Sequence, residues 1–144
     1  KTANVPKDVL DCDCLINMPV AKSHSATTLT LGLKNWMGAV TNDDRRGWHR
    51  LGLHQCIADF STAIRPKLTV IDATRIMLTK GPQGPGELDH PDELILSTDP
   101  VAADAYAATL FKKEPFVIGY IKIAHEMGLG CGDLKRVKVE RLEV

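Results

Sequence analysis

Residues 15–38, LINMPVAKSHSATTLTLGLKNWMG, decide the fold expected for this chain, because they read as a buried strand, a polar loop and a helix. The apolar run 12–18 predicts a strand covered on both faces, which Pro19 ends because proline cannot donate to a strand ladder. A helix is expected over 26–40, with Ser25 as its N-cap and one apolar stripe along its length. That stripe consists of Leu29, Leu33, Trp36, Met37 and Val40.

The remaining segments extend this unit into a pattern in which strands and helices alternate. A charged loop is expected over 41–50, and Asp99 before Pro100 marks the start of a helix. The order β-α-α-β-β-α-α-β predicts an α/β fold with a layered, largely parallel sheet flanked by helices. The further helices are expected over 51–64, 100–111 and 116–127, and the further strands over 68–72, 93–98 and 137–144.

Composition restricts the class of protein. The chain has 144 residues, and its 18 Lys and Arg balance 18 Asp and Glu. No basic patch and no apolar run of about 18 residues stands out, so we expect neither nucleic-acid binding nor a membrane span. The chain starts at Lys1 without an initiator Met, so we expect a single soluble α/β domain over 1–144 that is a fragment of a longer protein. Its compartment stays open between the cytoplasm and export through a signal absent from this chain.

Polar side chains that follow the expected strands form the candidate site, because ligands of open α/β sheets bind outside the carboxyl ends of the strands. Lys22 is the expected anion binder, and His24 titrates near neutral pH and can act as an acid or base. Asp72 can bind a hydroxyl group or a cation. Asp104 is a lone carboxylate in an apolar helix, so it needs a partner such as Lys22 or Lys34. Each of these residues also has a structural alternative, as a solvated charge, a helix cap or a turn.

We therefore predict a catalytic set and a ligand-binding set at this site. The catalytic set is Lys22, His24, Asp72 and Asp104, and the ligand-binding set is Asn17, Ser23, Lys34, Asn35 and Gly84.

Two other groups carry weaker signals. The loop 81–86 offers backbone N–H groups to a phosphate, but it matches neither a Walker A loop nor a dinucleotide fingerprint. His49 and His54 are five residues apart, which is about 140° around a helix and a poor arrangement for sharing a metal ion. The cysteines contain no CxxC pair, so no metal site and no iron–sulfur cluster is expected within this chain. These cysteines are Cys12, Cys14, Cys56 and Cys131.

Several segments also carry a family resemblance. They are NMPVAKSH, LTLGLKNWMG, HQCIADF, LTVIDA with GPQGPG, STDPVAADAYAA and AHEMGLG. In these segments, which span roughly residues 12–132, the chain resembles the family called domain of unknown function 362. The resemblance implies part of a larger, iron–sulfur or redox-associated protein of no established reaction, in which a 4Fe–4S cluster would lie outside this chain. The residues that it places in family motifs are Lys22, His24, Lys34, Asn35, Asp72 and Asp104.

Two functions of different classes follow, and the sequence leaves open whether the chain is an enzyme. The first is a redox- or iron–sulfur-associated enzyme domain that binds a small anionic ligand and works with a ferredoxin-like domain or partner. The alternative is a non-catalytic docking module for a partner protein or a missing domain, with contacts through Trp48 in loop 41–50 and through the strand at 137–144. Nucleotide or phosphate binding at 81–86 is a third option.

Overall fold

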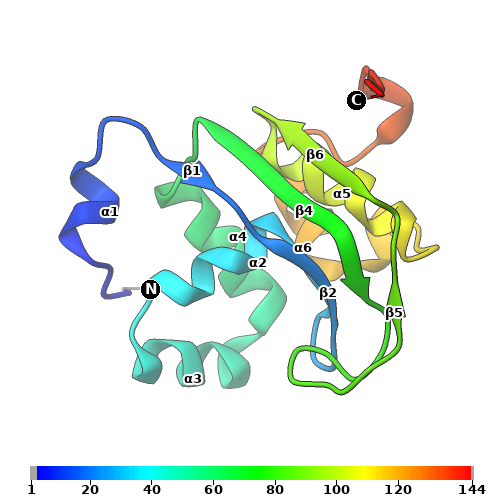
Figure 1. Cartoon of the computed structure of the whole chain (residues 1–144). Helices are drawn as coiled ribbons and strands as arrows, with labels where there is room; N and C mark the ends of the chain where they lie inside the picture. The colour runs from blue at the N-terminus through cyan, green and yellow to red at the C-terminus, as the bar shows by residue number, and fades with distance from the viewer. Residues whose placement is uncertain (1–2, 144) are drawn as a thin grey trace.

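A sheet with helices packed on one of its faces makes up the chain in the computed structural model, which describes residues 3–143 (Figure 1). The strands are β1 (Ile16–Asn17), β2 (Val20–His24), β3 (Thr28–Thr30), β4 (Leu68–Met77), β5 (Leu88–Asp89) and β6 (Glu93–Ser97). The α-helices are α1 (Lys7–Asp11), α2 (Gly32–Asn35), α3 (Asn42–Leu51), α4 (Leu53–Ala63), α5 (Pro100–Leu110) and α6 (Gly119–Glu126). Short 3-10 turns are η1 (Trp36–Ala39), η2 (Pro115–Val117) and η3 (Leu134–Arg136). The predicted layered α/β class is confirmed.

The long strand β4 organises the sheet. Along one edge of β4, β1 and β2 follow each other and run parallel to it, and β3 pairs with β2 in the antiparallel sense. Along the other edge, β6 and β5 run antiparallel to β4. The chain returns from β4 to β6 without a helix, and such a short return favours antiparallel pairing. Because Ser97 of β6 lies beside Thr69 of β4, the polar residues after β6 lie at the start of β4, away from the end of β2. The expected meeting of three strand ends at one rim is therefore wrong.

The stretch that decides the fold has a backbone different from the predicted one. The loop predicted around Lys22 is part of β2, and the helix predicted over 26–40 is wrong in its first half, where β3 forms. Threonines favour a strand there, and Thr28, with φ 65°, makes the turn into β3. Ser25 is not the N-cap, because α2 begins after Leu31. The predicted apolar stripe is buried all the same, at Leu29, Leu33, Trp36, Met37 and Val40.

Three further predictions are wrong. The strand predicted over 12–18 with both faces covered is reduced to β1, and one of its faces is open, since Ile16 and Met18 are 49% and 70% exposed. The predicted loop 41–50 is wrong, because residues 42–50 belong to α3 and Thr41 is the N-cap of this helix, whose side chain accepts a hydrogen bond from the Asp44 N–H. Acidic residues in the first turn also favour this helix. The strand expected over 137–144 is absent from the described part, which ends at residue 143, and Val144 lies outside it. The exact order of elements therefore differs from the predicted order.

The elements in the middle of the chain are confirmed. Helix α4 and strands β4 and β6 lie where the sequence places them, although β4 continues to Met77. Asp99 caps α5, since its Oδ1 accepts hydrogen bonds of 2.9 Å from the N–H groups of Val101 and Ala102. The helix predicted over 116–127 divides into η2 and α6. Within residues 3–143, no helix combines the length and apolarity needed to cross a bilayer.

Candidate functional site

Basic side chains from three elements influence one another near β2. Lys22 and His24 belong to β2, Lys34 to α2, and Arg45 and His49 to α3. Lys34, His49 and Lys22 act electrostatically on His24, and Lys22 and Arg45 act on Lys34. We call these five residues the cation cluster. The groups that act on His24 and Lys34 are all basic, so the cluster favours a negatively charged ligand.

Lys34 is the least solvated member of the cation cluster. Its residue is 8% exposed, and among residues 3–143 no carboxylate forms an ion pair with its amine. Burial lowers the pKa of Lys34 to about 8, and the neighbouring Lys22 and Arg45 add to this effect. The amine is therefore charged at neutral pH in surroundings that disfavour the charge. A ligand that brings negative charge would remove this penalty.

His24 contributes a neutral hydrogen-bond donor. Burial, followed by the charges of Lys34, His49 and Lys22, lowers the pKa of His24 to about 4, so its imidazole is neutral at pH 7. The backbone N–H of Ala26 donates to His24 Nδ1 over 3.1 Å. The ring hydrogen therefore lies on Nε2, which can donate to a bound ligand. Burial also lowers the pKa of Lys22, whose Nζ donates to the Val20 carbonyl over 3.2 Å.

Asp104 supplies the cap that α2 lacks in its own sequence. Its two carboxylate oxygens accept hydrogen bonds from the N–H groups of Gly32, over 2.7 Å, and Leu33, over 2.9 Å. The partners of this buried carboxylate are thus backbone groups rather than Lys22 or Lys34. Burial raises the pKa of Asp104 to about 7, although the two hydrogen bonds oppose the rise. Asp104 thereby fixes the first turn of the helix that carries Lys34.

Two asparagines tie the same turn to the sheet. Buried Asn17 of β1 donates from Nδ2 to the Gly32 carbonyl over 2.9 Å, and its Oδ1 accepts from Asn35 Nδ2 over 2.8 Å. A Cβ at Gly32 would lie 2.7 Å from Asp104 Oδ1, so only glycine fits between the helix and this carboxylate. The predicted ligand-binding residues Asn17 and Asn35 therefore hold α2 in position, two residues before Lys34 and one residue after it.

The other predicted site residues interact with groups outside the cation cluster. Ser23 Oγ accepts a 3.0 Å hydrogen bond from the Gly81 N–H, which ties the loop 81–86 to β2. Gly84 lies in that loop with φ 53°. Asp72 accepts from the N–H and the hydroxyl of Thr74, and these bonds lower the pKa of Asp72. The structure thus brings Lys22, His24 and Lys34 together and does not add Asp72 or Gly84 to them.

Arg45 and His49 of the cation cluster were not predicted from the sequence as site residues. They lie four residues apart on α3, a spacing that places two side chains on the same side of a helix. The signal was present in Thr41 followed by Asp43 and Asp44, which is a helix N-terminus pattern. Reading 41–50 as a loop concealed that spacing.

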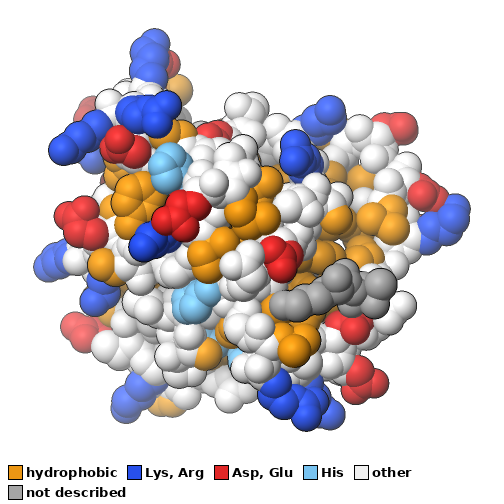
Figure 2. All heavy atoms as spheres, turned by 180° about the vertical axis from the view of Figure 1, so that it is seen from behind, with side chains coloured by type: hydrophobic (Ala, Val, Ile, Leu, Met, Phe, Trp, Pro, Cys, Tyr) orange, Lys and Arg blue, Asp and Glu red, His pale blue; other side chains and the backbone are white. Residues whose placement is uncertain are grey.

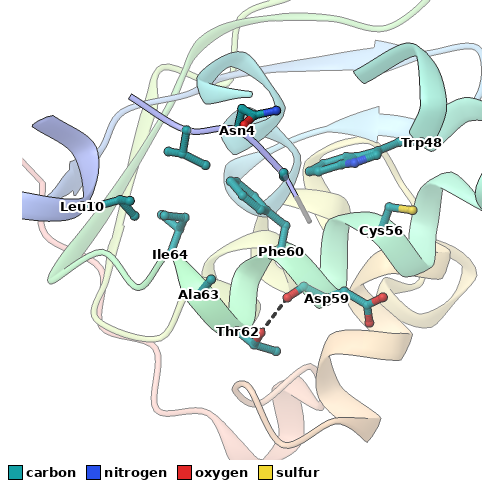
Figure 3. A pocket seen from close by; sticks show the side chains of 11 residues that line it. Asn4, Leu10, Trp48, Cys56, Asp59, Phe60, Thr62, Ala63 and Ile64 are labelled. Carbon is teal, nitrogen blue, oxygen red and sulfur yellow. Dashed lines mark hydrogen bonds between the residues drawn. The ribbon is translucent and has the colours of Figure 1, made fainter. Parts of the chain in front are cut away.

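A cavity of the described residues lies elsewhere. It has a volume of about 700 Å³ and lies between the N-terminal segment, α3 and α4, with the rings of Trp48 and Phe60 at its wall (Figure 3). These rings meet edge to face at 5.2 Å. Asp59 is the one charged residue of its lining. On the helical side of the molecule, acidic and basic side chains are interspersed around the periphery (Figure 2). We therefore place the candidate site at the cation cluster, where charge of one sign gathers.

The cysteines do not fit an iron–sulfur cluster. Cys12 and Cys14 are exposed before β1, Cys56 is buried in α4, and Cys131 is partly buried near the other end of the chain. In residues 3–143, no three His, Cys, Asp or Glu side chains are grouped so that they could hold a metal ion. The members of the cation cluster are also unsuited to a metal, because their lysines and arginine carry positive charge.

Comparisons with known proteins give a family and a relative. The family described as "Domain of unknown function (DUF362)" matches residues 1–109. The thylakoid-associated protein sll1697 of Synechocystis sp. (strain ATCC 27184 / PCC 6803 / Kazusa) is 28% identical over 131 residues. That match covers 85% of this chain and 40% of the relative, so the chain spans less than half the length of the relative. No solved structure matches the chain.

Proposed function

The chain belongs to the DUF362 family, a domain of unknown function, and we propose that its cation cluster binds a small oxyanion. The observation that carries this proposal is Lys34, an almost buried residue whose amine has no counter-ion among residues 3–143 and has two further cations beside it. Like charges near a buried amine destabilise the fold unless something neutralises them. A bound oxyanion would accept hydrogen bonds from the amines and cancel their repulsion.

The members of the cation cluster have distinct roles in this proposal. Lys34 supplies the central charge, because the hydrogen bonds of Asp104 and Asn17 to Gly32 fix the turn that carries it. Lys22 and Arg45 approach from β2 and α3 and add charge. His24 binds as a neutral donor through Nε2–H, and a bound anion would raise the pKa of this imidazole toward its ordinary value. His24 would then be able to take up a proton beside the ligand, which is the acid–base role predicted for it.

Phosphate binding to three variants tests the proposal. Inorganic phosphate is titrated into the unaltered chain and into Lys34→Met, Lys22→Met and Lys113→Met by isothermal calorimetry at pH 7. We expect Lys34→Met and Lys22→Met to weaken binding at least about tenfold, which corresponds to roughly 1.4 kcal/mol. Lys113→Met is the matched control, because this exposed lysine follows α5 and lies outside the cation cluster. Equal affinities in all four proteins would contradict the proposal, as would an equal loss in the control.

The pH dependence gives a second readout. Because the pKa of Lys34 is lowered to about 8, its charge is present below that pH and is lost above it. Phosphate affinity should therefore fall as pH rises from 8 to about 10, a range in which inorganic phosphate is already mainly the dianion, and the midpoint should lie above 8 because a bound anion stabilises the charged amine. In Lys34→Arg the guanidinium stays charged throughout this range, so the fall should be much smaller.

The wider predictions from the sequence fit this site to different extents. A redox or 4Fe–4S association stays a prediction about polypeptide beyond this chain, because the cysteines described above do not fit a cluster. Docking through Trp48 is not supported, since Trp48 is 7% exposed and packs against Phe60. Docking through a strand at 137–143 is not supported either, since these residues form none. The exposed apolar face of the sheet is a better candidate for docking.

A further inference from the structure

One face of the sheet is apolar and uncovered. Side chains of β1, β2, β6 and the β1–β2 junction point away from the helices and remain between 46% and 70% exposed. Their chain neighbours Asn17, Ala21 and Ile95 point to the other side and are buried. We call the exposed set the sheet face: Ile16, Met18, Val20, Leu94 and Leu96. Figure 1 shows the helices behind the sheet, with no element in front of it.

The sheet face is continuous across β1 and β2, β4 and β6. Ile16 lies beside Leu68, and Leu96 lies beside Val70. Val20 and Leu94 flank Asp72 from its two sides. A monomeric protein rarely exposes a contiguous apolar patch of this kind, and such a patch usually marks an interface.

The strand arrangement also indicates what covers this face. β1 and β2 run parallel to β4, and parallel pairs are typical of α/β sheets whose faces are covered by helices, whereas the antiparallel pairs of β4 with β5 and β6 do not require this. The described residues supply helices for one face only. Asp72 lies in the middle of the apolar face, and its Oδ1 takes both bonds from Thr74. A covering layer must therefore be apolar over most of its surface and must offer a donor opposite the second oxygen of Asp72.

We propose that amphipathic helical polypeptide from outside residues 1–144, in a longer protein that contains this domain, packs on the sheet face and places a basic or hydrogen-bond-donating side chain opposite Asp72. The relative sll1697 supports this occupant over a second copy of the chain, because only 40% of its length corresponds to the matched region. The remainder is long enough to form a complete layer. This inference does not rest on the proposed anion site.

Methionine oxidation measures whether the sheet face is covered. Met18 belongs to the face and is 70% exposed, whereas Met127 follows α6 on the helical side and is 39% exposed. Both thioethers react with hydrogen peroxide when solvent reaches them. The 144-residue chain and the full-length product of its natural reading frame are treated in parallel, and sulfoxide at each methionine is followed by mass spectrometry. We expect Met18 to oxidise at least about tenfold more slowly in the full-length product, with Met127 as the unchanged internal control.

A variant links any protection to the proposed contact. Leu96→Asp in the full-length product should restore fast oxidation of Met18, because a buried carboxylate would disfavour the covering layer. Leu142→Asp is its control, since Leu142 is 88% exposed and lies outside the sheet face. Equal rates of Met18 oxidation in the 144-residue chain and in the full-length product would overturn the proposal. A natural reading frame that encodes nothing beyond these 144 residues would also overturn it. Protection of Met18 in the 144-residue chain through a dimer, detected by light scattering and abolished by Leu96→Asp, would overturn it in favour of a second copy.

Discussion

The carboxyl group of Asp104 should make the stability of the chain depend on pH between 5 and 8. Burial raises its folded-state pKa to about 7 from an ordinary value of 3.8. A group whose pKa is raised on folding stabilises the fold fully below its unfolded pKa, and this contribution is lost as pH rises through the folded pKa. Between pH 5 and 8 the unfolded carboxyl binds almost no proton, whereas the folded one releases its proton. Integrating this difference gives a loss of roughly 2–3 kcal/mol in the free energy of unfolding.

Asp104→Asn isolates that contribution. The amide has nearly the same shape and no proton to lose in this range, so pH effects from His24 and the other groups cancel when the two proteins are compared. Urea unfolding is followed through the fluorescence of the buried Trp36 and Trp48 at several pH values. The stability of the unaltered chain relative to Asp104→Asn should fall by roughly 2–3 kcal/mol from pH 5 to pH 8.

Asp72→Asn is the matched control for this experiment. The hydrogen bonds from Thr74 lower the pKa of Asp72 below 3.8, so this carboxyl is ionised in both states above pH 5 and its replacement should shift stability by a constant amount. A constant difference between the unaltered chain and Asp104→Asn would refute the reasoning. It would mean that the hydrogen bonds from Gly32 and Leu33 outweigh the burial of Asp104 and keep its pKa low.

Two further predictions concern the elements that hold the fold together. Gly32→Ala should lower the free energy of unfolding by roughly 2–4 kcal/mol in the same urea assay, because the new Cβ would lie 2.7 Å from Asp104 Oδ1. Gly38→Ala, which meets no atom within 4 Å, should be nearly neutral, and equal effects of the two substitutions would contradict this account. Asp99→Ala should cost about 2 kcal/mol, because Asp99 caps α5 and also accepts a 2.7 Å hydrogen bond from the Cys131 N–H. Asp133→Ala, which removes the cap of the exposed turn η3, should cost less, and the reverse order would argue against that role of Asp99.

Local signals located the elements in the middle of the chain because each carries its own start or stop. Asp99 followed by Pro100 fixed the start of α5, and Pro66 lies where α4 gives way to β4. The failure at 26–40 has the opposite cause. Its apolar spacing fits a helix, but the same residues are buried by a short hairpin followed by a turn of helix, so periodicity alone could not separate the two. The cap that makes α2 form comes from Asp104, 72 residues away from Gly32 along the chain.

The candidate site was predictable only in part for the same reason. Lys22, His24 and Lys34 lie within one short segment, so their proximity followed from local sequence. The contribution of Arg45 and His49 required recognition of α3, which carries a local signal in Thr41, Asp43 and Asp44. The position of Asp72 depended on the continuation of β4 to Met77, which places Asp72 inside the strand rather than at its end. Strand pairing, rather than propensity, set that length of β4.

The cation cluster and the sheet face both include residues of β2. Substitutions in other elements can nevertheless disturb one of them without the other. Val20 of the sheet face lies two residues before Lys22 of the cation cluster, so a layer that covers Val20 would also border the anion site. Lys34, however, is carried by α2, in the helical layer, whereas Leu96 belongs to the far edge of the sheet. Lys34→Met therefore removes the charge that attracts an oxyanion and leaves the sheet face intact, and Leu96→Asp does the reverse. Because each substitution disturbs one feature, loss of phosphate binding and exposure of Met18 report independently on the two proposals.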